Sequence, residues 1–396
     1  MTARPSVPKT ALILSGGGAR AAYQVGVLKA IRTLLPDPAP NPFPILCGTS
    51  SGAINAATLA CHAEDFGDGV DRLVGLWSHF HAGHVYRADP AGVAASGARW
   101  LGALALGWFM RKSPRALLDN APLRRTLADQ LDFSRIDRAI ASHALHSISI
   151  TCSGYSSGQS VAFFQGRPDL EPWQRSQRVG AHVKLGVDHL MASSAIPFLF
   201  PAVKIHREWF GDGSMRQLSP MSPAIHVGAD RILVIGLEQT SEANDRRKAD
   251  RYPSLAQIAG HALSGIFIDS LAVDLERMTS INRTLETMPE DVRRDRNIRL
   301  RPIDVLVIAP SERLDHLAAQ HAQSLPWTLR LLLRGIGAMN RHGGALTSHL
   351  LFEASYTKAL IDLGYRDATA RKEELMHFLG HPGFNENSHQ ITPSSR

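Results

Sequence analysis

The chain alternates short apolar runs with longer stretches of mixed polarity. Apolar residues recur every three or four positions in Ala22–Leu35, which predicts a helix there. Strands that alternate with helices predict an α/β fold with a mainly parallel central sheet covered on both faces. Six runs have the length and composition of buried strands: Ala11–Leu14, Ile45–Cys47, Ile148–Cys152, Val161–Phe164, Ile232–Leu237 and Val305–Ala309.

The two ends of the chain differ from its middle. After Pro310 the sequence is helix-forming, and it ends in a polar tail over Gly383–Arg396. We therefore expect one α/β domain over residues 9–310 and a helical C-terminal extension over residues 311–396. Met1–Thr10 is polar and carries no apolar core of a signal peptide. Trp100–Met110 is apolar but has about half the ~20 residues of a membrane helix, so we expect a cytoplasmic protein.

Composition and charge narrow the class of protein without naming its chemistry. With 44% hydrophobic and 20% charged residues, the 396-residue chain is globular rather than disordered. Its net charge of +7 suits an anionic lipid surface or a nucleic acid equally well. The scattered Cys47, Cys61 and Cys152 show no C-x-x-C spacing. The absence of such a spacing favours reduced cysteines in the protein core over a metal site.

A glycine-rich turn follows the first predicted strand and precedes the first predicted helix. Gly16, Gly17 and Gly18 allow backbone N–H groups to approach a ligand, and the helix N-terminus adds a positive dipole. We expect an anion or an oxyanion above this turn. Gly16–Ala21 also fits the dinucleotide fingerprint G-x-G-x-x-G/A, but the acidic residue nearest the required spacing, Asp37, lies in a proline-rich loop.

A second glycine-rich element, Gly48-Thr49-Ser50-Ser51-Gly52, matches G-x-S-x-G. A nucleophile elbow needs a strand, a sharp turn and a helix, with small residues flanking the serine. Ser50 has this context, since it follows a predicted strand and precedes a good helix start. The second copy, Gly154–Gly158, lies between two predicted strands. We expect Ser50 to be the nucleophile and Ser156 to lie in a hairpin turn.

Taken in order, these elements resemble the patatin-like phospholipase family. The likeness rests on Gly-Gly-Gly-x-Arg after the first strand, on G-x-S-x-G, on the block Ala192–Pro201 and on Asp212-Gly213-Ser214. It extends through Pro220–Leu237 and covers about residues 11–237. The chain departs from the family pattern at two positions. Ala21 stands where the family has glycine, and Ser214 stands where the family has glycine or alanine.

The resemblance implies a three-layer α/β/α hydrolase fold and a Ser50–Asp212 dyad that cleaves carboxylic esters of phospholipids or related lipids. Ser50 would form an acyl-enzyme while Asp212 acts as base. An oxyanion hole would comprise Gly16, Gly17 and Gly18 with Arg20, and Gly48 and Gly52 would form the elbow. No cofactor and no metal are implied. A carboxylate base needs a partly desolvated site, for which Trp209 and Phe210 are the candidates.

The remaining expectations concern how substrate reaches the site and which other mechanisms or functions the sequence allows. We expect a lid within residues 91–120 and peripheral contact of Trp100–Met110 with anionic membrane rather than with nucleic acid. His226 and His261 follow Asp212 and are the candidates for a Ser-His-Asp triad, although neither lies in a recognisable loop signature. A non-catalytic acyl-lipid-binding protein and a nicotinamide-binding oxidoreductase are the two competing functions from different classes.

Overall fold

A computed structural model describes residues 8–87, 116–238, 255–295, 300–335 and 344–381. The predicted lid falls largely outside the described residues, and so do Trp100–Met110 and the tail Gly383–Arg396. In the described part of the chain, no helix is both long enough and apolar enough to cross a membrane.

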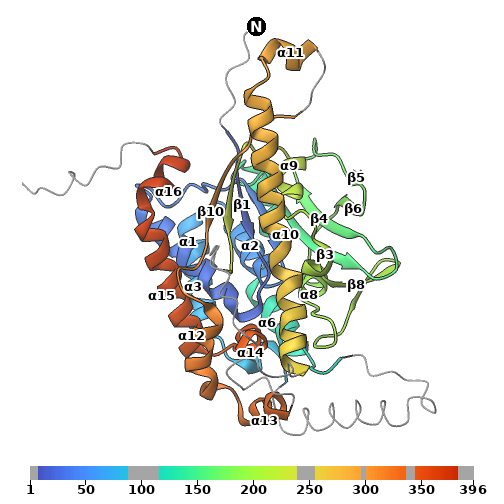
Figure 1. Cartoon of the computed structure of the whole chain (residues 1–396), viewed down its shortest axis with the longest axis vertical. Helices are drawn as coiled ribbons and strands as arrows, with labels where there is room; N and C mark the ends of the chain where they lie inside the picture. Colours follow the sequence, from blue (N-terminus) through green and yellow to red (C-terminus); the bar gives the residue numbers. More distant parts are fainter. Residues whose placement is uncertain (1–7, 88–115, 239–254, 296–299, 336–343, 382–396) are drawn as a thin grey trace, which may run out of the picture.

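One mixed sheet forms the centre of the molecule (Figure 1), in the order β10-β9-β1-β2-β3-β4-β6-β5, with β8 paired to β3 and β7 to β8. All six predicted strands are present, and the pairs from β10 through β3 are parallel. The sheet is therefore mainly parallel on the side that contains β1 and β2, as predicted. The strands are β1 (Thr10–Leu14), β2 (Ile45–Thr49), β3 (Ser147–Gly154), β4 (Ser160–Gly166), β5 (Trp173–Arg175), β6 (Arg178–His182), β7 (Val203–Ile205), β8 (Glu208–Asp212), β9 (Arg231–Ile235) and β10 (Asp304–Ile308).

Helices cover both faces of this sheet. Alternation along β1 sends Leu12 and Leu14 into one apolar core and Ala11 and Ile13 into the other. Figure 1 shows α10 crossing one face, with α1 and α2 behind the other. The helices are α1 (Ala22–Leu34), α2 (Ser51–Cys61), α3 (Phe66–Ser78), α4 (Ala82–Val85), α6 (Ala121–Gln130), α7 (Ser134–Ala141), α8 (Val187–Ser193), α9 (Ser222–His226), α10 (Leu255–Glu286), α11 (Glu290–Asp295), α12 (Leu314–His321), α13 (Trp327–Gly335), α14 (Gly344–Leu350), α15 (Ala354–Ala370) and α16 (Lys372–Phe378), with short 3-10 helices η1 (Gly18–Ala21), η2 (Gly213–Arg216) and η3 (Ala322–Ser324).

The C-terminal helices pack into the same core as the motif-bearing part of the chain. Leu346, Leu360 and Met376 belong to one hydrophobic cluster with the buried residues of α1 and α2. Two glycines let α1 and α15 cross closely, because a side chain at Gly26 or Gly364 would meet the backbone of the other helix. The prediction of helices after Pro310 is thus confirmed. These helices pack on the side of the sheet that α1 and α2 cover.

Candidate active site

Ser50 lies on a sharp turn between β2 and α2. Its backbone φ of 53° is in the left-handed region, which a residue with a side chain adopts only under strain. Gly52 permits this turn, because a Cβ there would collide with the carbonyl of Leu14 at the end of β1. Ser50 is also 1% exposed. The strand, strained serine and helix are the local structure that the G-x-S-x-G motif predicted.

A second serine, Ser193, holds this turn in place through hydrogen bonds. The N–H of Ser50 donates a hydrogen bond to Ser193 Oγ over 2.8 Å, and Ser193 Oγ donates to the carbonyl of Thr151 over 2.6 Å. Ser193 is fully buried at the end of α8, so the elbow is tied to strand β3 through one side chain. The sequence contains this serine within Ala192–Pro201 but gives no indication that it contacts Ser50.

Asp212 lies at the end of β8, where the antiparallel register with β3 places it opposite Cys152. Its carboxylate is 1% exposed, and Oδ1 accepts a hydrogen bond from the Ser214 N–H over 3.0 Å. Burial raises the pKa of Asp212 to about 6, and hydrogen bonding to Ser50 and Ser214 opposes that rise. Oδ2 makes no hydrogen bond of ordinary geometry to a described residue. Ser50 and Asp212, which are 162 positions apart in the sequence, are therefore neighbours.

The apolar surroundings of Asp212 differ from the expectation in one respect. Phe210 is buried, whereas Trp209 is 47% exposed. Alternate residues of a strand point to opposite faces, so Phe210 shares the face of Asp212 and Trp209 points away from it. The prediction that Trp209 helps to desolvate Asp212 is wrong.

The glycine-rich turn connects β1 to η1 and is buried throughout its three glycines. Gly17 donates its N–H to Ser51 Oγ over 3.2 Å. Gly18 has a φ of 58° and begins η1, so its N–H takes no part in the hydrogen bonds within that helix. A side chain at Gly18 would collide with the carbonyl of His349. The turn thus brings Gly18 next to Ser50, and the Gly18 N–H donates to no residue in the described part of the chain.

Arg20 supports this turn and does not enter the pocket. It is 4% exposed, its Nε donates to Ser348 Oγ over 2.8 Å, and its Nη1 forms an ion pair with Glu238. His349, the next residue of α14, lies 2.9 Å from the carbonyl oxygen of Gly17 through its Nδ1 atom. Sequence reasoning missed both Ser348 and His349, because no local motif marks α14.

A narrow, largely apolar pocket opens onto Ser50. Trp77, Phe80 and Phe352 form part of its wall, and Gly18 and Ser194 contribute polar atoms close to Ser50. The Oγ atom of Ser194 is buried and has no hydrogen-bond partner in the described part of the chain. The site therefore combines a strained serine, a buried carboxylate and a backbone donor at the end of an apolar pocket.

A family model described as a patatin-like phospholipase matches residues 12–225, more than half of the chain. The chain belongs to the patatin-like phospholipase family. The matched region contains the glycine-rich turn, the elbow at Ser50 and Asp212.

Two curated phospholipases share part of this patatin-like sequence. A cGAMP-activated phospholipase from Pseudomonas aeruginosa is 27% identical over 215 residues, which are 54% of this chain and 55% of that protein. A cUMP-AMP-activated phospholipase from Escherichia coli is 37% identical over 102 residues, 26% of this chain and 29% of that protein. The matches thus span about half of one relative and less than a third of the other. The solved structure of VipD from Legionella pneumophila is 13% identical, with a TM-score of 0.33, and the match covers 93% of this chain and 75% of that one.

The two departures from the patatin-like pattern lie at buried positions whose backbone atoms make the contacts. Ala21 accepts a hydrogen bond from Asn55 Nδ2 through its carbonyl over 3.2 Å. Ser214 holds Asp212 through its N–H, which any residue at that position except proline provides, and its hydroxyl also lowers the pKa of Asp212. Neither replacement removes one of these contacts.

The competing candidates lie elsewhere or lack the required context. Ser156 is exposed in the turn between β3 and β4, as predicted. His226 stacks on Trp173 at 4.9 Å and interacts through Nδ1 with Ser222, and the side chain of His261 is outside the described part. Asp37 caps its own loop by accepting from the Ala39 N–H, and this loop ends before β2 begins at Ile45.

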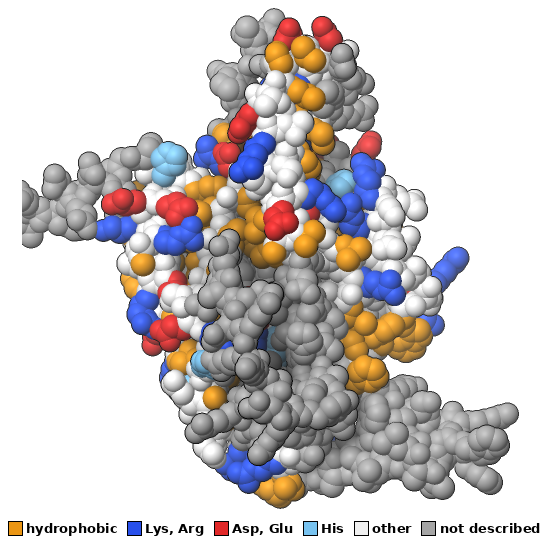
Figure 2. All heavy atoms as spheres, viewed as in Figure 1, with side chains coloured by type: hydrophobic (Ala, Val, Ile, Leu, Met, Phe, Trp, Pro, Cys, Tyr) orange, Lys and Arg blue, Asp and Glu red, His pale blue; other side chains and the backbone are white. Residues whose placement is uncertain are grey.

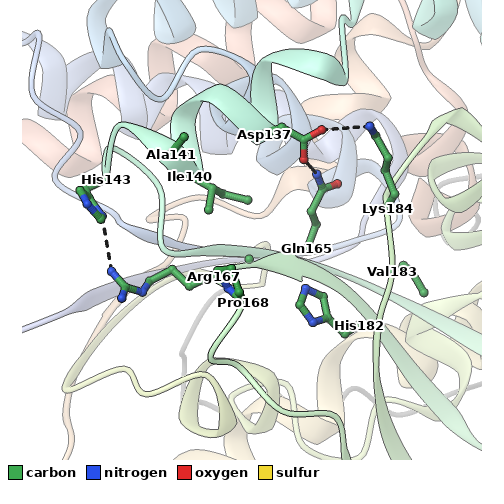
Figure 3. Close-up of a pocket in the computed structure, with 11 residues that line it drawn as sticks. Asp137, Ile140, Ala141, His143, Gln165, Arg167, Pro168, His182, Val183 and Lys184 are labelled. Atoms are coloured by element: carbon green, nitrogen blue, oxygen red, sulfur yellow. Dashed lines mark hydrogen bonds and ion pairs between the residues drawn. The ribbon is translucent and has the colours of Figure 1, made fainter.

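A second pocket lies where β4 ends, next to the start of β3 and so at the end of the strands opposite to Ser50 (Figure 3). Its walls come from α7, from the end of β4 and from the segment after β6. The cations around it are already engaged: Lys184 is paired with Asp137 over 3.0 Å, and Arg167 with Asp169 over 3.0 Å. None of the predicted site residues lines this pocket, and the described residues contain no group of three or more His, Cys, Asp or Glu side chains placed to hold a metal ion.

Proposed function

We propose that this protein is a serine acyl hydrolase that cleaves carboxylic esters of phospholipids or related acyl lipids through Ser50 and Asp212. The observation that carries the proposal is the pairing of a strained, buried serine with a buried carboxylate whose pKa is raised to about 6. A raised pKa makes a carboxylate a stronger base while leaving it mostly ionised near neutral pH. Family membership supports the same reaction class.

The proposed reaction has two steps. Ser50 Oγ attacks the ester carbonyl carbon as its proton passes to Asp212, and the resulting tetrahedral intermediate expels the alcohol, which takes that proton. Asp212 then accepts a proton from a water molecule whose oxygen attacks the acyl carbonyl carbon. When the second tetrahedral intermediate breaks its bond to Ser50 Oγ, Asp212 returns that proton to Oγ, which releases the fatty acid and free Ser50. In both steps the negative charge on the carbonyl oxygen is stabilised by the N–H of Gly18, while Gly17 and Arg20 hold the turn in place.

The pocket indicates the substrate class. Its aromatic and aliphatic wall favours an acyl chain over a polar ligand. The curated relatives are named phospholipases, and we therefore propose phospholipid as the principal substrate, drawn from the surface of a bilayer. Two further classes of function predict different behaviour: a lipid-binding protein would retain lipid without cleaving it, and an oxidoreductase would bind a nicotinamide cofactor.

A panel of defined lipids, with products identified by mass spectrometry, tests this function. The unmodified chain should release fatty acid, and the Ser50→Ala variant should release none while melting at the same temperature. The panel is run with and without cGAMP and cUMP-AMP, because the two relatives are named for these activators. Lipid that is bound but recovered intact under every condition would support a lipid-binding protein, and enhanced NADH fluorescence would support an oxidoreductase.

A further inference from the structure

Exposed large hydrophobic side chains gather at one end of the molecule. Scattered single residues of this kind are normal on a soluble protein, but a gathering marks an interaction surface. Eight such side chains are exposed in the described part of the chain. All except Val273 and Leu300 belong to β8, to the β3–β4 turn, to the loops on either side of β7–β8, or to α13, which lies at the end of the molecule toward which β1 runs. We call the six that remain the docking face: Tyr155, Phe198, Trp209, Leu218, Trp327 and Leu331.

Two members of the docking face lie on or against β8, the strand that ends at Asp212. Trp209 precedes it on β8, and its carbonyl accepts the N–H of Tyr155 over 3.0 Å. The Tyr155 ring covers Gly211, so it shares a face of β8 with Trp209. Burial and then the charge of Asp212 raise the pKa of Tyr155.

Two further members lie on loops that form the active site. Phe198 is 77% exposed and has a φ of 65°, although its neighbours Ile196 and Phe200 line the pocket of Ser50. Leu218 follows Gln217, whose Oε1 accepts a hydrogen bond from Thr49, the residue before Ser50. Phe198 is therefore held outward, in an unfavourable backbone conformation, beside the pocket that accepts substrate.

Helix α13 supplies the remaining pair. Trp327 and Leu331 are one helical turn apart, so both project from the same side of the helix. In Figure 1, β1 runs from the N-terminal end of the molecule toward the end occupied by α13 and α14. Helix α14 packs on η1, so this end is the one that holds the glycine-rich turn.

Exposed cations lie among these side chains. Lys204 is opposite Trp209 in the β7–β8 pair, Arg207 lies in the turn between those strands, and Arg216 follows Asp212. All three are exposed, and none forms an ion pair with a described residue. Figure 2 shows hydrophobic side chains next to Lys and Arg side chains over the region of β8.

We propose that the docking face binds the surface of a bilayer that contains anionic lipid. Aromatic side chains partition to the boundary between headgroups and acyl chains, and neighbouring cations are attracted to anionic headgroups. This orientation would present the Ser50 pocket to the substrate. The proposal rests on the proposed function for its choice of partner, and it assigns membrane contact to described residues outside Trp100–Met110.

Flotation of the full chain with vesicles tests the docking face. Every protein carries Ser50→Ala, so no lipid is cleaved during the measurement. Vesicles consist of phosphatidylcholine alone or of phosphatidylcholine with phosphatidylglycerol. The test variant combines Phe198→Ser, Trp209→Ser, Trp327→Ser and Leu331→Ser, and the control combines Val273→Ser with Leu300→Ser, two similarly exposed positions outside the face. Thermal unfolding checks that both variants are folded.

The parent protein should bind the anionic vesicles more strongly, and salt should weaken that binding. The test variant should bind at least roughly tenfold more weakly, and the control within about twofold of the parent. Binding by the test variant at the level of the parent, or an equal loss in the control, would overturn the proposal. So would a change of oligomeric mass in the test variant with flotation unaltered, since the face would then join two copies of the chain. The flotation result does not depend on hydrolysis, because every protein carries Ser50→Ala. A failure of the proposed hydrolase function is seen separately, in the lipid panel.

Discussion

His349 donates a hydrogen bond from Nδ1 to the carbonyl oxygen of Gly17 over 2.9 Å, across 332 positions of the sequence. Burial and the nearby charge of Arg20 hold the pKa of His349 well below 6.5, so the ring is neutral and Nδ1 carries its proton toward the carbonyl. Ser348, on the same short helix, accepts from Arg20. The C-terminal helices therefore hold the glycine-rich turn that carries Gly18, the proposed oxyanion donor.

Replacing His349 tests this positioning role. His349→Ala should lower kcat by about tenfold to a hundredfold with little change in KM, because displacement of the turn affects the transition state more than binding. Asn carries an N–H at the position of Nδ1, so His349→Asn should restore most of the activity. Steady-state kinetics on a short-chain ester measure both. Equal kcat values in the Ala and Asn variants would indicate that the hydrogen bond has no role in catalysis.

The two central glycines of the turn should differ in their tolerance of a methyl group. At Gly18 the positive φ and the His349 carbonyl both oppose a side chain, so Gly18→Ala should reduce activity by about a hundredfold or more. At Gly17 the obstacle is the end of the Leu237 side chain, which can move. Gly17→Ala should therefore keep activity within about tenfold. Assays at matched protein concentration compare the activities of the two variants. A larger loss of activity in Gly17→Ala than in Gly18→Ala would mean that Gly18 does not face the reacting carbonyl.

The raised pKa of Asp212 predicts the pH dependence of the reaction. The base must be ionised to accept a proton, so kcat/KM should fall about tenfold for each pH unit below about 6 and level off above it. A pH series on a soluble ester, corrected for any unfolding, gives this profile. Activity that stays constant well below pH 6 would contradict the assignment of Asp212 as the base.

The same shift predicts a stability effect of the opposite sign to that of an ordinary paired carboxylate. The pKa of Asp212 in the folded protein, about 6, lies above the ordinary value of 3.8. The folded state therefore favours the protonated carboxyl, and the contribution to the stability of the fold that is present below pH 3.8 is lost as the pH rises through 6. At pH near 8 the ionised Asp212 costs up to roughly 3 kcal/mol. Asp212→Asn should consequently melt at a higher temperature than the unmodified chain at that pH while losing roughly a thousandfold or more of its activity. A lower melting temperature at high pH would show that the carboxylate stabilises the fold.

Local patterns predicted six of the ten described strands and the strand-turn-helix context of Ser50 for a physical reason, whereas Asp212 was implied by the family resemblance. A side chain at Gly48 would collide with the backbone of Ala53 within the turn itself, so this part of the constraint is visible in the local sequence, whereas Gly52 faces the carbonyl of Leu14 on β1. Buried parallel strands are likewise marked by their own composition. Short edge strands such as β5 and β7 were not predicted, because three residues carry too little pattern.

Contacts between distant segments were not predictable in the same way. Nothing near Ser193 indicates that its hydroxyl meets the N–H of Ser50, and nothing near His349 indicates that it meets Gly17. Trp209 was expected to help desolvate Asp212 because the sequence analysis predicted no strand over Glu208–Asp212, so it did not apply the alternation that separates Trp209 from Phe210. These positions are fixed by tertiary packing rather than by the local chain.

The proposed reaction depends most directly on Ser50 being the activated nucleophile. Labelling with a fluorophosphonate, followed by peptide mapping by mass spectrometry, identifies the serine that reacts. The unmodified chain and Ser156→Ala should each carry one adduct, on Ser50, and Ser50→Ala should carry none while melting normally. An adduct on Ser156, or undiminished labelling of Ser50→Ala, would contradict the assignment of Ser50.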